Sequence, residues 1–148
     1  MLTKTIIALF NRDLLRLKNE IESYKIESNI WAIDNSISNS AGNLCLHLLG
    51  NLNTYIGAEI GKTGYIRQRP LEFSSKNIPR TTLISSIENV IQVVNESLLL
   101  LSEEDFKNEY PILVFEHPCS YEYLLIHLTT HLTYHLGQIN YHRRLLDK

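Results

Sequence analysis

The sequence predicts an all-α protein, a four-helix bundle that forms one domain over residues 1–148. Two observations support this fold class. Four stretches carry apolar residues at alternating intervals of three and four, and the chain is otherwise poor in strand-like segments. Hydrophobic residues make up 44% of the chain and charged residues 20%, which supplies enough apolar side chains for one buried core.

The first helix is expected from Leu2 to about Tyr24. Its apolar positions follow the spacing of a core-facing bundle helix: Ile7, Phe10, Leu14, Leu17, Ile21 and Tyr24. A loop rich in serine and asparagine follows over residues 28–40. We expect its two large apolar residues, Trp31 and Ile33, to fold back onto the bundle.

The second helix is expected to begin near Ser38 or Ser40, either of which can cap its free amides, and to run to about Ile60. Its core-facing positions are Leu44, Leu48, Leu52 and Tyr55. The connection from Gly61 to Pro79 has no sustained periodicity and is long for a link between two bundle helices. Its length indicates a crossover, or a wall beside a pocket.

The third helix is expected from about Thr81 to Leu101, with Pro79 at its entrance. Its core-facing positions are Leu83, Ile87, Val90, Val94, Leu98 and Leu101. Ser120 can cap the fourth helix. The apolar side of that helix carries Leu124, Leu128, Leu132, Leu136 and Ile139. Between the two helices, residues 112–115 could be extended, but an isolated strand would have no partner.

Charge and hydropathy argue against several classes of function. The formal net charge is −2 and lysines and arginines form no dense block, so nucleic acid is not an expected partner. No apolar run approaches the ~20 residues of a membrane span, and residues 1–10 lack the apolar core of a secretory signal. We therefore expect a cytoplasmic protein without a membrane partner. Cys45 and Cys119 form no CxxC pair, which argues against a disulfide framework.

Three histidines in the expected fourth helix indicate a metal site. His127, His131 and His135 are four residues apart, so a helix stacks them along one side. Neighbouring rings lie ~6 Å apart along the axis, and either His127/His131 or His131/His135 could bind one ion. The outer two are ~12 Å apart, so one ion cannot easily take all three. A third ligand must come from another helix, and His47 lies beside the core-facing side of the second helix.

Other residues in the chain have simpler interpretations. Position 132 is leucine, where an HExxH metalloprotease has its glutamate, so peptidase chemistry is not indicated. His117 in a loop and His142 near the chain end are expected to face solvent. Arg67 and Arg69 in the long connection could bind an anionic substrate, although a solvated surface is the expectation for both.

The segment His131-Leu-Thr-Tyr-His135-Leu-Gly-Gln-Ile139, with His47 in Leu46-His-Leu-Leu-Gly-Asn51, resembles the DinB-like (DinB/YfiT-type) superfamily of small metal-binding bundles. The resemblance covers the whole chain in helix number and order. It implies an up-down-down-up bundle with a long crossover between the second and third helices. It also implies that His47, His131 and His135 bind one divalent metal ion, commonly nickel or zinc, and so favours His131/His135 as the pair.

The resemblance further implies a function. Characterised members include enzymes that use a low-molecular-weight thiol for transfer or isomerisation, and members often form homodimers. Three neutral imidazoles leave the ion its full charge and an open position, where a water or thiol loses its proton more readily. We therefore expect a metal-dependent enzyme acting on a small molecule, of thiol-dependent transferase or hydrolase type. The alternative is a non-catalytic metal-binding or dimeric interaction protein of the same fold.

Several polar residues could orient the ligand rings. Asn51 lies one turn after His47, and Gln138 lies three residues after His135. His127 stacks one turn from His131 and could support it or act as a general base. No residue in the sequence is identified as the catalytic acid or base.

Overall fold

The computed structural model describes residues 2–148, and within that range the protein is all-helical. The five α-helices are α1 (Leu2–Glu22), α2 (Ala41–Leu52), α3 (Arg69–Ser74), α4 (Arg80–Leu98) and α5 (Tyr121–Leu146). Three further helical segments are the 3-10 turns Glu27–Trp31 and Asp105–Lys107 and the π-helix Asn53–Ala58. The described residues contain no β-strand, and a single antiparallel bridge joins Glu109 to Ser120. The all-α class is therefore confirmed, with one short helix more than expected.

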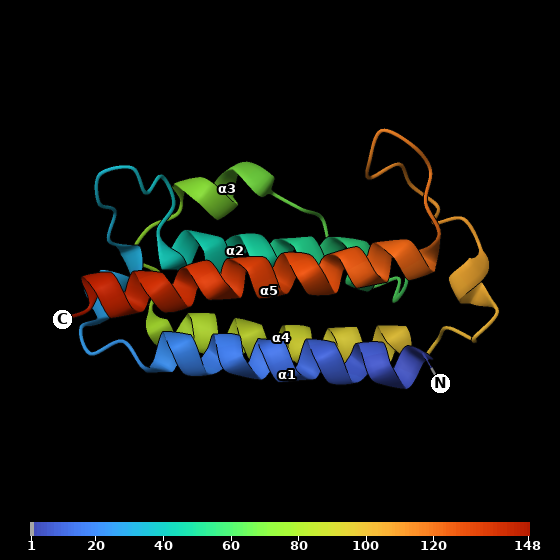
Figure 1. The fold of residues 1–148 in the computed structure, drawn as a ribbon, viewed down its shortest axis with the longest axis horizontal. Coiled ribbons are helices and arrows are strands. Elements are labelled where there is room, and N and C mark those ends of the chain that lie inside the picture. Colours follow the sequence, from blue (N-terminus) through green and yellow to red (C-terminus); the bar gives the residue numbers. More distant parts are fainter. Residues whose placement is uncertain (1) are drawn as a thin grey trace.

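The four long helices lie side by side, and each packs on two of the others (Figure 1). Helices α1 and α5 run in one direction, and α2 and α4 run in the opposite direction. Helix α1 contacts α4 and α5, while α2 contacts the same two helices from the other side. The short helix α3 lies on the outer face of α2. This arrangement puts α2 next to α5, the two helices that carry the candidate metal ligands.

The core is formed by the apolar positions that the sequence pattern identifies. Nearly all of them are fully buried, including Phe10, Leu14, Leu48, Leu83, Leu128 and Leu132. Removing these side chains from water is the main favourable contribution to folding. Ile7, Tyr55 and Leu101 are only partly buried, the last because α4 ends at Leu98. No helix in residues 2–148 is long and apolar enough to cross a membrane.

The predicted caps of the two ligand-bearing helices are present. The Ser40 hydroxyl accepts a hydrogen bond from the Asn43 amide at the start of α2, over 3.1 Å. The Ser120 hydroxyl accepts one from the Tyr123 amide at the start of α5, also over 3.1 Å. Each cap satisfies an amide that would otherwise lack a partner at the first turn.

The connection from residue 61 to residue 79 was expected to be irregular, and it contains α3. Pro70 lies in the first turn of this helix, where its missing amide hydrogen costs little, and Glu72 lies in the same turn, where a negative charge is favourable. Asn43 on α2 donates hydrogen bonds to the main-chain oxygens of Glu72 (2.9 Å) and Ser75 (2.8 Å). These bonds fasten α3 onto α2 beside His47.

A buried carboxylate fixes α5 against α1. The Thr133 hydroxyl on α5 donates a 2.7 Å hydrogen bond to Asp13 on α1, and Arg12 pairs with the same carboxylate. Burial opposes ionisation of Asp13, but the hydrogen bonds and the charges of Arg12 and Arg16 outweigh it and lower its pKa. Thr133 lies between two candidate ligands in the sequence, so this contact restrains the part of α5 that carries them.

The expectation that His142 faces solvent is wrong. The residue is 4% exposed, and both ring nitrogens have partners. Its Nε2–H donates to the main-chain oxygen of Ala32 (2.8 Å), so its Nδ1 accepts from the hydroxyl of Tyr24 (2.7 Å). This histidine ties the end of α5 to the loop after α1. His117, in contrast, is exposed as expected.

Candidate metal centre

Three histidines from two helices meet at one point. His47 on α2 is buried, and His131 and His135 on α5 are partly buried. The ring centroids lie 5.1 Å apart for His47 and His131, 5.2 Å for His47 and His135, and 4.6 Å for His131 and His135. One nitrogen from each ring lies within 4.8 Å of the others. These are the three residues that the family resemblance implies as ligands.

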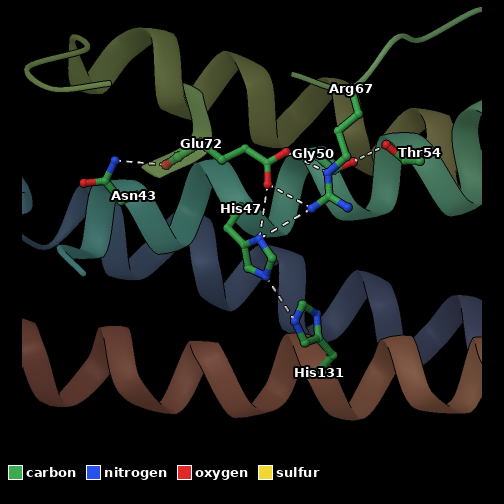
Figure 2. A network of polar contacts seen from close by, with 7 residues as sticks. All are labelled: Asn43, His47, Gly50, Thr54, Arg67, Glu72 and His131. Atoms are coloured by element: carbon green, nitrogen blue, oxygen red, sulfur yellow. Dashed lines mark hydrogen bonds and ion pairs between the residues drawn. The ribbon is translucent and has the colours of Figure 1, made fainter. Parts of the chain in front are cut away.

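The spacing of the nitrogens suits a shared cation. Nε2 of His47 and Nε2 of His131 face each other at 3.2 Å (Figure 2). Two imidazole nitrogens bound to one ion at ~2.05 Å in tetrahedral geometry lie ~3.3 Å apart. The residues therefore fit a divalent ion with little movement of these two rings.

Hydrogen bonds on the far side of two rings select the tautomer that metal binding needs. His47 Nδ1–H donates to Glu72 Oε1 over 3.1 Å, and His135 Nδ1–H donates to Gln138 Oε1 over 2.7 Å. With the proton held on Nδ1, the lone pair of Nε2 is free in each neutral ring. Nδ1 of His131 is buried and has no hydrogen-bond partner among residues 2–148. The expected pairing of Gln138 with His135 is thus present.

Glu72 is itself held by Arg67. The guanidinium makes two parallel hydrogen bonds to the carboxylate, Nε to Oε2 at 2.8 Å and Nη2 to Oε1 at 2.9 Å (Figure 2). Nη2 of Arg67 also lies 3.5 Å from Nδ1 of His47. When Nδ1 donates its proton to Glu72, both of these nitrogens are donors, so they do not form a hydrogen bond with each other. The hydrogen bonds to Glu72 raise the pKa of Arg67. The expectation of a solvated Arg67 is wrong, because only 15% of its side chain is exposed.

Gly50 makes room for this carboxylate. A Cβ atom at Gly50 would collide with Oε2 of Glu72 and lie 2.7 Å from its Cδ. Any larger residue would therefore push the Glu72 side chain away from His47. The glycine lies three residues after His47, on the part of α2 that α3 covers.

The rings of His47 and His131 are both electrically neutral at physiological pH. Burial, followed by the neighbouring His135 and His47, lowers the pKa of His131 to about 4. Burial also lowers the pKa of His47 and outweighs the bond to Glu72, which acts in the opposite direction. A neutral imidazole is the form that binds metal, so a cation need not displace protons from these rings at pH 7.

The other residues expected near the site have separate roles. The His127 ring stacks on His131 at 6.1 Å and contacts Phe115 at 4.8 Å, so it lies beside the three-histidine group rather than in it. Asn51 is buried, and its side-chain oxygen has no hydrogen-bond partner within residues 2–148.

Glu72 and Phe73, which contact the His47 ring from α3, were missed by the sequence reasoning. A signal for them existed. The run Arg69-Pro-Leu-Glu-Phe73 puts a proline and then an acidic residue in what can be the first turn of a short helix.

A groove of about 440 Å³ opens beside His135. It runs along the C-terminal half of α5, and its other wall is formed by the loop at residues 36–39 and by Leu44 of α2. The start of α2 and the end of α5, which form the groove, lie at the same end of the molecule in Figure 1. The volume falls within the usual range for a small-molecule site.

The comparison with protein families identifies one family for this chain. No curated protein matches the chain. One family model, described as "Protein of unknown function (DUF1572)", matches residues 8–148. The match includes the three histidines, Glu72 and all of α2 to α5. The chain therefore belongs to the DUF1572 family of proteins of unknown function.

Proposed function

We propose that the chain is a DinB-like metalloprotein in which His47, His131 and His135 bind one divalent metal ion. The observation that carries the proposal is the 3.2 Å approach of the Nε2 atoms of His47 and His131, with the His135 ring at 88° to that of His47. The antiparallel course of α1 and α5 relative to α2 and α4 supports an up-down-down-up four-helix bundle.

The donor set favours zinc or nickel. Three imidazole nitrogens are ligands of intermediate softness, which suit late first-row divalent ions better than magnesium or calcium. Zinc sites with three protein ligands keep a further position open, as catalytic sites require.

We further propose that the chain is a metal-dependent enzyme for a small molecule, a thiol-dependent transferase or a hydrolase. When bound, the ion supplies Lewis-acid chemistry that promotes loss of a proton from a water or thiol. Glu72 and Gln138 hold the rings of His47 and His135 in the orientation and tautomer that this chemistry needs. The groove, which His135 lines, supports the proposal of a substrate bound next to this ligand.

Metal analysis of the purified chain tests the site. We expect about one zinc or nickel ion per chain after loading and gel filtration, measured by inductively coupled plasma mass spectrometry. A variant with alanine at His47, His131 and His135 should retain almost none. His117→Ala, which removes an exposed histidine outside the site, should retain the wild-type amount. A stoichiometric ion in the triple variant would disprove the assignment. A conjugation screen with thiols and an electrophile then tests catalysis.

The second candidate is a non-catalytic metal-binding or dimeric interaction protein, and the outer face of α5 favours it. Tyr123, Ile126 and Tyr134 are each about half or more exposed on this helix, and a Cβ added at Gly137 would meet open space. An exposed apolar helix face of this kind suits a homodimer. We expect light scattering to give twice the chain mass, and Ile126→Glu to give the monomer mass. A monomeric wild-type chain would disprove the homodimer. Metal-dependent turnover would disprove a non-catalytic function.

A further inference from the structure

The groove next to His135 has a lining that defines what it can bind. Its apolar parts come from both walls, with Ile37 and Leu44 on one side and Tyr134, Tyr141 and Leu145 along α5. The polar groups are hydroxyls and amides, such as the side chain of Gln138. No aspartate, glutamate, lysine or arginine lines it within the described part of the chain. The groove therefore offers apolar contact and neutral hydrogen bonds, and no counter-charge.

The two histidines in the lining have ring nitrogens that are already engaged within the protein. His142 uses both ring nitrogens inside the protein, one with Tyr24 and one with Ala32. His135 has Nδ1 committed to Gln138. Arg144 stacks over the Tyr141 ring, 5.3 Å from its centroid, but is not part of the lining. In the metal-free chain, an anionic group lying in the groove would lose water without gaining a charged partner, which is costly.

Aromatic side chains add a shape preference. Tyr134 and Tyr141 are 65% and 63% exposed, and both line the groove. The Tyr134 ring also lies 5.2 Å from that of His135, so the aromatic surface continues to the metal ligand. A planar ring of a ligand can pack against this surface, which adds a preference beyond apolar burial alone.

We propose that the substrate that reacts at the histidine centre is an uncharged molecule with an aromatic or similarly flat apolar body, bound in this groove. The proposal rests on the proposed function and narrows it. The body of the substrate lies along α5 between Leu44 and Leu145, with its reactive end toward His135. An anionic co-substrate would have to approach from another side.

Two probes of the same shape test the charge preference. They are 4-(hydroxymethyl)phenylmethanethiol, which is neutral at pH 7, and 4-(mercaptomethyl)benzoate, whose carboxylate is negative. Binding of each is measured by calorimetry to the metal-free and the zinc-loaded full chain. We expect the neutral probe to bind the metal-free chain about tenfold more tightly or better, because the groove itself offers no charged partner for the carboxylate. Tyr141→Lys should reverse the order, and His117→Lys, outside the groove, should leave it unchanged.

The outcomes separate this inference from the proposed metal site. If zinc does not bind but the metal-free chain still prefers the neutral probe, the metal proposal fails and the groove preference stands. If zinc binds but the metal-free chain binds the two probes equally, or binds neither, the groove inference is overturned and the metal site stands. The inference would also be overturned if the benzoate bound more tightly than the neutral probe and lost this advantage in Arg144→Gln. Arg144 would then be the charged partner of a carboxylate in the groove.

Discussion

Glu72→Ala is expected to lower the zinc affinity of the histidine centre by about 10- to 100-fold, the usual effect of removing the partner of a ligating histidine. The carboxylate accepts the proton of His47 Nδ1, so its loss frees the ring to rotate and to take the other tautomer. The same change should lower the free energy of unfolding of the metal-free chain by about 3–5 kcal/mol, because Arg67 is left largely buried without its partner. Competition with a chromophoric chelator gives the affinity, and urea unfolding gives the stability.

Three further variants separate the two effects. Glu116→Ala removes an exposed carboxylate outside the site and should change neither quantity. A double variant with methionine at Arg67 and Glu72 removes both charges, so it should recover much of the stability but not the affinity for zinc. Gly50→Ala keeps the carboxylate but displaces it, and should lower the affinity in the same direction as Glu72→Ala. Wild-type zinc affinity in Glu72→Ala would show that this contact does not support the ligand.

The helices and the three histidines were predictable because their signals are local. Core-facing apolar residues such as Leu83, Ile87 and Val90 identify the buried face of a helix without knowledge of the elements that pack on it. Four-residue spacing places His131 and His135 on one face without knowledge of the fold. Choosing His135 over His127, however, required the family resemblance, because the pairs His127/His131 and His131/His135 have the same spacing along the helix.

The residues that the sequence reasoning missed depend on contacts between distant segments. Glu72 is buried only because α3 folds back onto α2, 25 positions from His47 in the sequence, and because Gly50 leaves room for it. Arg67 is sequestered by that same carboxylate. His142 precedes two arginines near the end of the chain, a setting typical of exposed residues, yet the packing of α1 against α5 brings Tyr24 and Ala32 to it. Such pairings are set by tertiary structure and leave no periodic pattern.

Acid is expected to destabilise the metal-free chain below pH 6.5, before most carboxylates titrate. The pKa of His131 falls from an ordinary 6.5 to about 4 on folding, so between those values the unfolded chain binds more protons than the folded one. The contribution of the neutral His131 ring to the free energy of unfolding is complete above pH 6.5 and is lost as the pH falls toward 4. Burial lowers the pKa of His47, which acts in the same direction.

Urea unfolding in the presence of a chelator, from pH 7.5 to pH 4.5, measures this loss. After allowance for solvent screening, the part due to His131 should be about 1–2 kcal/mol. His131→Asn keeps a polar group of similar shape without the titration, so its stability should fall less steeply over the same interval. His117→Asn should keep the wild-type slope, because His117 is exposed. A wild-type profile that is flat from pH 7 to pH 5, or one that rises toward acid, would mean that His131 is not held neutral by its surroundings. The ring would then lack the environment that prepares it to bind a cation.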